Sequence, residues 1–220
     1  SYLELCTAGT GRRYAEIEQR RFDPCHRLMY NCADDFADGL PIDFRSSGLD
    51  IAACLDAMRR RRLRYDIILA DSWHLYETSR RDIAAALGLV ADDGVIVVHD
   101  CRPPREEICT PAYMPGEWCG VTYKAYVDFV TTSGLRYLTV DTDYGCGVLF
   151  PGKQRWWRRL LAAMRPASAE RRRLVAGWRA CGTDYGRAYA YLERNDRALL
   201  NLVSVETFMR TGAGGAARTP

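Results

Sequence analysis

Two short apolar runs of this chain, residues 65–70 and 95–98, each lead directly into side chains that can exchange protons or bind metal ions: Asp71 and His74 after the first run, His99 and Asp100 after the second. Both runs are rich in Ile and Val, a pattern typical of parallel strands covered on both faces. In open parallel sheets, ligands bind beyond the carboxyl ends of the strands. We therefore expect two carboxylates and two imidazoles to meet at one edge of a sheet and form a reaction site.

These four groups suit proton transfer or metal binding. A histidine that titrates near neutral pH can take the proton from a hydroxyl group of a substrate. Paired carboxylates can instead hold Mg²⁺, which lowers the pKa of the hydroxyl and orients it. Two simpler roles stay open. Asp71 could cap the helix that follows it, and His74, which neighbours Trp73, could pack in the core.

The elements that would position these groups alternate between strand and helix patterns, which predicts a doubly wound, Rossmann-like α/β sheet that is mostly parallel. An antiparallel hairpin near the end of the sheet would supply one edge. We expect strands at residues 2–5, 21–24, 40–45, 65–70, 95–98, 135–140 and 147–150, and helices near 49–60, 77–87, 121–133, 156–164 and 169–181. A proline-punctuated loop, residues 102–118, is long enough to serve as a lid or binding loop.

The 220 residues suffice for one domain with a well-filled core. Residues 1–152 form the predicted core, residues 153–210 an arginine-rich helical extension of the same domain, and residues 211–220 a tail that we expect to be disordered. The net charge of +3 hides a basic excess in residues 153–187. A solvated helical face explains that excess more simply than nucleic-acid binding, because no strand interleaves aromatic and basic side chains.

Several broad classes are excluded by composition. No run approaches the roughly 18 apolar residues that a membrane span needs. We also expect no secretory leader, because a strand pattern follows Ser1 at once. The nine cysteines include no C-x-x-C pair, which argues against a cysteine zinc site and favours free thiols in a reducing compartment. We therefore expect a cytoplasmic protein. The sequence leaves open whether the chain forms a homo-oligomer.

Four segments, in this order and spacing, resemble class I S-adenosylmethionine-dependent methyltransferases. The similarity is greatest to a small bacterial group with a D-G-x-H-x-Y segment, then H-D, then a G-D-V-W-K-like helix start and a final hairpin. The matching residues are 71–76, 99–101, 120–124 and 141–145, and the resemblance covers about residues 2–150. Three positions depart from the pattern: Cys6 and Ser72 replace glycines, and Val121 replaces the aspartate.

The resemblance implies a site for S-adenosylmethionine in the segment 4–11, which includes Cys6. Glu4 would face the amino group of the cofactor, and backbone N–H groups near Gly9 and Gly11 would face its carboxylate. Asp23, placed at the end of the predicted second strand, suits the two ribose hydroxyls because a carboxylate accepts from both. The simpler explanations are that the glycines only link a strand to a helix, and that Asp23 before a proline only forms a turn.

The resemblance also implies that Asp71 and Asp100 bind a metal ion, that Asp71 borders the cofactor, and that His99 is the base. His74 would contact the substrate or stack in the core. The implied reaction is methylation of a hydroxyl on a small molecule, a sugar or secondary metabolite, and nucleic acid is a less plausible acceptor. Two alternatives remain. The departures fit a cofactor-binding regulatory protein without turnover, whereas a nicotinamide-linked Rossmann enzyme is disfavoured by the lack of a full G-x-G-x-x-G.

Overall fold

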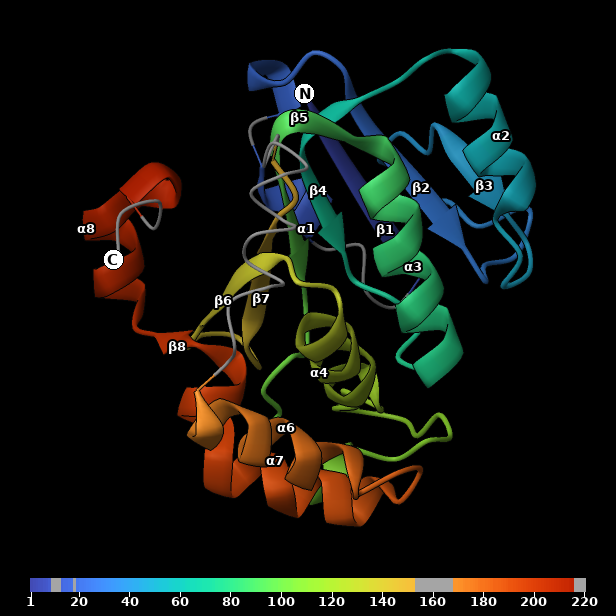
Figure 1. Cartoon of the computed structure of the whole chain (residues 1–220). Coiled ribbons are helices and arrows are strands. Elements are labelled where there is room, and N and C mark those ends of the chain that lie inside the picture. The colour runs from blue at the N-terminus through green and yellow to red at the C-terminus, as the bar shows by residue number, and fades with distance from the viewer. Residues whose placement is uncertain (9–12, 18, 153–167, 216–220) are drawn as a thin grey trace.

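The computed structural model describes residues 1–8, 13–17, 19–152 and 168–215. Its centre is an eight-stranded sheet in the order β3-β2-β1-β4-β5-β7-β6-β8 (Figure 1). The strands are β1 (Tyr2–Thr7), β2 (Cys25–Tyr30), β3 (Phe44–Ser46), β4 (Tyr65–Ala70), β5 (Val90–Val98), β6 (Arg136–Val140), β7 (Cys146–Phe150) and β8 (Leu202–Val203). The first five strands pair in parallel, and β7 is antiparallel to both β5 and β6. The predicted Rossmann-like fold is confirmed.

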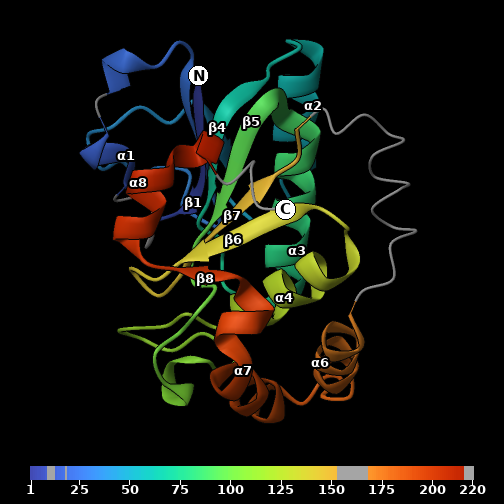
Figure 2. The ribbon, with the colours of Figure 1, turned by 60° about the vertical axis from the view of Figure 1, so that its left-hand side comes forward.

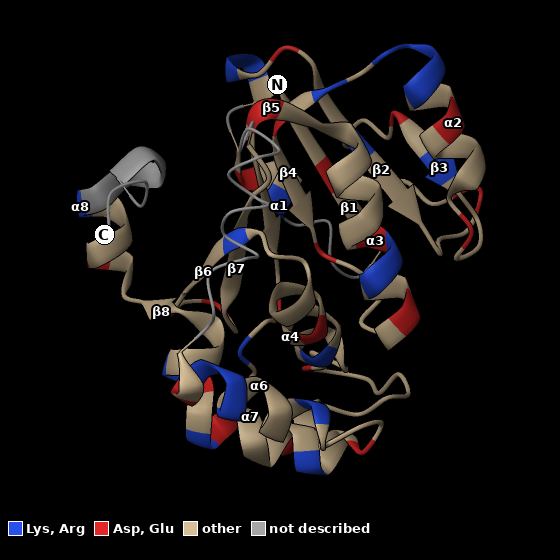
Figure 3. Ribbon diagram, in the orientation of Figure 1, with Lys and Arg blue, Asp and Glu red and all other residues tan. Residues whose placement is uncertain are grey.

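The α-helices are distributed unevenly around this sheet. They are α1 (Arg13–Glu16), α2 (Ala52–Arg60), α3 (Tyr76–Leu89), α4 (Thr122–Thr132), α6 (Ala169–Arg179), α7 (Tyr185–Leu200) and α8 (Val205–Gly215). Figures 1 and 2 show α2, α3 and α4 together on one face of the sheet, with α1 and α8 on the other side. Helix α7 packs against α4, and α6 packs against α7; the blue segments of both helices in Figure 3 are arginines. In the described part of the basic segment, residues 168–187, the side chains of Arg172, Arg173, Arg179 and Arg187 are exposed, which agrees with a solvated helical face.

The second strand is not where the sequence pattern placed it. Residues 19–21 form a short 3₁₀ turn, and β2 begins only after Pro24. The polar start of β2 hid the strand, because it contains Arg27, a residue that is rarely buried. In the structure the Arg27 side chain is 1% exposed, and its guanidinium bonds both carboxylate oxygens of Asp38 at 3.0 and 2.6 Å. This ion pair makes a charged residue acceptable inside the sheet.

Other boundaries also differ from the sequence expectations. Strand β1 continues to Thr7, so Cys6 lies within the strand and not in the expected loop, while Glu4 lies in the strand as expected. Strand β5 begins at Val90, and a Cβ on Gly94 would come within 2.8 Å of the Asp66 carbonyl oxygen of β4, so only glycine fits there. Helix α8 includes residues 211–215, which were expected to be disordered. The hairpin is not the outermost element, because β8 pairs with β6. The helix expected at 156–164 lies outside the described residues.

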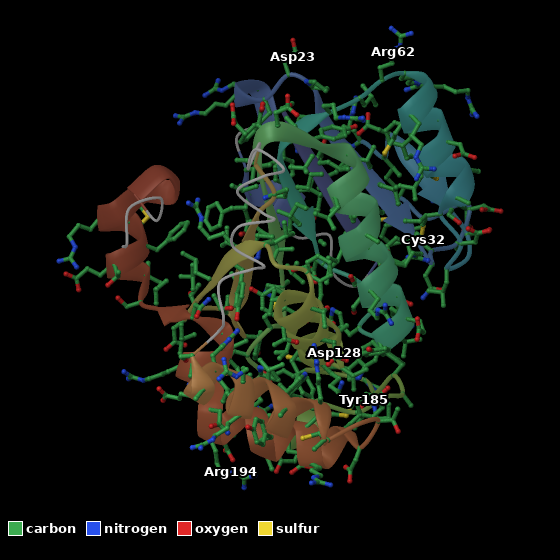
Figure 4. The ribbon with its side chains drawn as sticks, in the orientation of Figure 1. Asp23, Cys32, Arg62, Asp128, Tyr185 and Arg194 are labelled. Carbon is green, nitrogen blue, oxygen red and sulfur yellow. The ribbon has the colours of Figure 1, made fainter. Side chains whose placement is uncertain are left out.

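Asp128 of α4, labelled in Figure 4, links α4 to α3 and α6. It accepts hydrogen bonds from the hydroxyl of Tyr76 in α3 at 2.7 Å and from the indole N–H of Trp178 in α6 at 2.7 Å. It also pairs with the ammonium of Lys124, one turn earlier in α4. Trp178 is fully buried and Lys124 nearly so, so both depend on this carboxylate for a partner.

Replacing Asp128 with alanine should therefore lower the free energy of unfolding by about 3 kcal/mol, since a buried indole and a buried ammonium lose their acceptor. Urea titration followed by tryptophan fluorescence measures this loss. Asp56→Ala is the matched control, because Asp56 pairs with Arg59 on the exposed surface of a helix. Equal losses in the two variants would show that the network contributes nothing beyond a surface ion pair.

The Arg27–Asp38 pair predicts a loss of stability in acid. The hydrogen bonds from Arg27 hold the pKa of Asp38 below its usual value. The pair therefore stabilises the folded state above the unfolded pKa of about 3.9, and this contribution disappears as the pH falls through the lower folded-state value. Wild type should lose more stability than Asp38→Asn between pH 5 and pH 2, as measured by urea unfolding at each pH. Parallel curves for the two proteins would contradict this account.

Candidate active site

The four predicted side chains meet at the carboxyl ends of β4 and β5, as the sequence analysis expected. The two strands pair in register up to Ala70 and Val98, so the residues that follow them emerge side by side. The Nε2 atom of His74 lies 3.1 Å from Asp100 and 3.5 Å from Asp71. The Nδ1 atom of His99 lies 3.2 Å from Asp100 and 3.5 Å from Asp71. Each imidazole thus contacts both carboxylates.

His74 is fixed by the segment that precedes α4. Its Nδ1 atom lies 2.6 Å from the carbonyl oxygen of Trp118, and its own carbonyl oxygen accepts a hydrogen bond from the backbone N–H of Val121. Between these contacts, Gly120 has a φ of +52° and touches His74 so closely that a Cβ there would lie 2.2 Å from the His74 carbonyl oxygen. The glycine of the G-x-x-x-K segment is therefore required by close packing.

His99 is held by a residue that the sequence analysis did not assign to the site. Its Nε2 atom lies 3.0 Å from Asp143, which lies in the turn between β6 and β7 and also pairs with Arg13. Because β7 inserts antiparallel between β5 and β6, the carboxyl end of β6 faces the same edge as β5. The sequence signal for Asp143 was an acidic residue shortly after a third apolar run, residues 135–140. That signal places Asp143 at the site only when the order of the strands is known.

Asp100 has an unusual backbone conformation. Its φ is +59°, in the left-handed region that non-glycine residues seldom adopt. The hydrogen bonds of the next two residues hold the chain there: the N–H groups of Cys101 and Arg102 donate to the carbonyl oxygens of Gly145 and Tyr144. Backbone strain of this kind is concentrated at functional sites.

The cluster opens into a cavity of about 440 Å³, within the roughly 300–1,000 Å³ typical of small-molecule sites. Its lining combines the four predicted residues with groups from α1, the 116–119 segment and the β6–β7 turn: Arg13, Glu16, Asp71, His74, His99, Asp100, Gly116, Glu117, Trp118, Cys119, Asp143 and Tyr144. A second cavity of about 440 Å³ lies beside it, lined partly by Ala8 and Arg27, and the two share Glu16. Both cavities border α1, because Arg13 and Glu16 line the first and Ala15 and Glu16 line the second.

The charges in the cluster are strongly coupled. Burial lowers the pKa of His99, but its contacts with Asp100 and Asp71 outweigh this effect and raise the pKa to about 12. Burial likewise opposes the charged form of His74, and the same two carboxylates raise its pKa. Burial also disfavours the charged form of Asp71, yet the bonds from both imidazoles lower its pKa. The two carboxylates thus favour the protonated form of both imidazoles, and a protonated imidazole cannot accept a proton.

The residues expected to bind a cofactor are less well placed. Glu4 is completely buried, accepts a hydrogen bond from the hydroxyl of Tyr2 at 2.7 Å, and lines neither of the two cavities just described. Cys6 is likewise buried and lines neither. Asp23, labelled in Figure 4, precedes β2 and so lies at the amino ends of the parallel strands, whereas Asp71 follows the carboxyl end of β4. Its expected position at the carboxyl end of a strand is wrong. Gly9 and Gly11 lie outside the described residues.

Three aromatic rings form a wall next to His74. Trp73 and Tyr113 are stacked with centroids 5.1 Å apart, and Trp118 meets both rings at 5.2 Å. Trp118 is buried and lines the cavity, whereas Tyr113 is 58% exposed. Two of the rings come from the proline-punctuated loop, which sequence analysis singled out only by its length.

No family model matches this chain, and no curated protein matches it. Among solved structures, the O-methyltransferase from Bacillus cereus in complex with S-adenosylhomocysteine is similar over 68% of this chain and 73% of that chain, with 11% identity and a TM-score of 0.48. A putative O-methyltransferase from Klebsiella pneumoniae is similar over the same shares, with 12% identity and a TM-score of 0.47.

The MycE methyltransferase of mycinamycin biosynthesis, in complex with Mg, S-adenosylhomocysteine and mycinamycin VI, is similar over 69% of this chain, with 15% identity and a TM-score of 0.42. This chain spans 44% of the length of that protein. Similarity at these levels assigns no activity. None of the helices in the described parts of this chain is long and apolar enough to cross a membrane.

The close contact at Gly120 predicts that Gly120→Ala destabilises the site more than an ordinary change of a left-handed glycine, which costs about 1–2 kcal/mol. The added methyl group must push His74 away from the carboxylates. Gly134→Ala is the matched control, because Gly134 also has a positive φ but has open space around its Cβ position. The free energy of unfolding and the NMR shifts of the His74 ring measure the effect. Equal costs and unchanged His74 shifts would show that the contact is unimportant.

Proposed function

We propose that this protein is an S-adenosylmethionine-dependent methyltransferase that methylates a hydroxyl group of a small molecule, such as a sugar or secondary metabolite. The observation that carries the proposal is the largely buried cluster of two carboxylates and two imidazoles at the carboxyl ends of β4 and β5, open to a cavity that α1 also lines. Central strand ends are where Rossmann-like sheets bind ligands. The four segments that resemble class I methyltransferases support the same conclusion.

The donor would bind across the carboxyl ends of β1 and β4. S-adenosylmethionine supplies a methyl group already activated on a sulfonium, so the protein contributes position and electrostatics. Backbone N–H groups of residues 8–11, with Gly9 and Gly11, would face its carboxylate, and Asp71 would border it. We leave Glu4, Cys6 and Asp23 out of this contact set, because the first two have no exposed surface and the third lies at the far end of the sheet.

The cluster fits a divalent cation. Oxygen atoms of Asp71 and Asp100 and the Nε2 atom of His74 all lie within 4.8 Å of one another, and all three residues are buried. A divalent cation such as Mg²⁺ at this position would orient the acceptor hydroxyl and lower its pKa. Positive charge beside His99 would also lower the pKa of its imidazole. Nδ1 of His99 could then accept the hydroxyl proton while Asp143 holds Nε2 in place.

The aromatic wall of Trp73, Tyr113 and Trp118 suits the acceptor. Flat rings bind the apolar face of a sugar or another ring through area burial, and the exposed Tyr113 leaves room for such contact. The wall adjoins the cluster through Trp118, whose carbonyl oxygen holds His74. An acceptor that lay along these rings would direct one of its hydroxyls toward the carboxylates.

Calorimetry with S-adenosylhomocysteine and with NAD⁺ tests donor binding. We expect binding of the first ligand and none of the second. Transfer of labelled methyl to a library of hydroxyl compounds, with Mg²⁺ and with EDTA, tests turnover and its metal requirement. His99→Ala should lower the rate about a hundredfold or more, as the loss of a general base does, with little change in donor affinity. A large loss of donor binding in His99→Ala would show that His99 has another role.

The alternative is a cofactor-binding protein without turnover. Two observations favour it: Glu4 and Asp23 are not positioned to contact the cofactor, and Val121 replaces the aspartate expected from the resemblance. The same experiments distinguish the two functions. Donor binding without labelling of any hydroxyl compound supports the regulatory alternative, and binding of NAD⁺ alone would overturn both.

A further inference from the structure

We infer that Asp71, Asp100 and His74 form a site that selects a first-row transition-metal dication, such as Fe²⁺, Co²⁺ or Zn²⁺, over Mg²⁺. The inference rests on the proposed function insofar as it names the cation of the same site. Its structural basis is separate, because it depends on the orientation of the two histidines and not on the methyl donor.

The orientation of His74 carries the first step. A carbonyl oxygen can only accept a hydrogen bond, so the 2.6 Å contact with Trp118 requires a proton on Nδ1 of His74. In the neutral imidazole Nε2 then carries a lone pair, and this atom faces Asp100 at 3.1 Å and Asp71 at 3.5 Å. A lone pair directed at two carboxylates is repulsive unless a cation, either a proton or a metal ion, lies between them.

His99 repeats this arrangement from the other side. Its Nδ1 atom faces the same two carboxylates, and its Nε2 atom is held by Asp143 at 3.0 Å. Imidazoles that bind metals usually have the second ring nitrogen fixed by a carbonyl or carboxylate, which sets the tautomer and the ring orientation. Both histidines of this site have such a partner. We assign the ligand atom to His74, because the ligand atoms of Asp71, Asp100 and His74 all lie within 4.8 Å of one another, and His99 keeps its proposed role as the base.

The donor set determines the class of metal. Mg²⁺ prefers oxygen ligands in a near-ideal octahedron, and it seldom takes a nitrogen ligand from protein. Imidazole nitrogen suits Fe²⁺, Co²⁺, Ni²⁺ and Zn²⁺, whose affinities for mixed nitrogen and oxygen sites exceed that of Mn²⁺ in most cases. One imidazole and two carboxylates on a buried edge therefore favour these ions. The remaining coordination positions would face the cavity.

The test uses the untagged full chain, freed of metal and titrated with CoCl₂, ZnCl₂ and MgCl₂ in a calorimeter without methyl donor. We expect Co²⁺ and Zn²⁺ to bind at least about tenfold more tightly than Mg²⁺, and His74→Asn to weaken Co²⁺ binding by about tenfold or more. His26→Asn is the matched control, because His26 is hydrogen-bonded to Tyr65 away from the site and is the one histidine of the sequence besides His74 and His99.

A spectroscopic measurement on the wild-type protein tests the inference even if a variant fails to fold. Pulsed EPR of bound Mn²⁺ should show coupling to a ¹⁴N nucleus in wild type and in His26→Asn, and its loss in His74→Asn. Equal affinities for Co²⁺ and Mg²⁺, or an absence of nitrogen coupling in wild type, would overturn the inference and leave an all-oxygen site. Absence of all metal binding would also overturn it. None of these three outcomes bears on the binding of S-adenosylhomocysteine, which tests the proposed function separately.

Discussion

Charge balance between Asp71, Asp100 and the two imidazoles is the constraint on which this site depends. Two buried carboxylates that both lie within 3.5 Å of the same imidazole nitrogens repel each other unless positive charge lies between them. Protonated histidines or a bound cation can each supply that charge. The exchange of one for the other is what would turn a static ion-pair cluster into a reactive one, because only a neutral imidazole accepts a proton.

The rest of the fold supports this arrangement from three directions. Strands β4 and β5 bring the four groups together, the turn after β6 brings Asp143 to His99, and the segment before α4 brings the Trp118 carbonyl oxygen to His74. Two backbone features maintain the geometry: the left-handed conformation of Asp100 and the close approach of Gly120. Asp128 then ties α4 to α3 and α6, so the helices behind the site are fixed as well.

The errors of the sequence analysis have a common physical cause. Burial patterns identify strands from apolar residues, so β2 was missed because a buried ion pair places Arg27 inside it. The missed strand shifted Asp23 to the wrong end of the sheet. Asp143 and the aromatic wall were missed because their neighbours are distant in sequence, and only the insertion of β7 between β5 and β6 brings that turn to the site.

The sequence by itself determined the sheet class, the two central strands and the four polar groups that follow them, because local apolar periodicity sets these features. Only the tertiary structure decided which nitrogen of each histidine faces the carboxylates and which faces an anchor. Those choices depend on Trp118 and Asp143, which reach the site through a loop and a hairpin. Local pattern encodes where a strand ends, whereas side-chain orientation is set by contacts between distant segments.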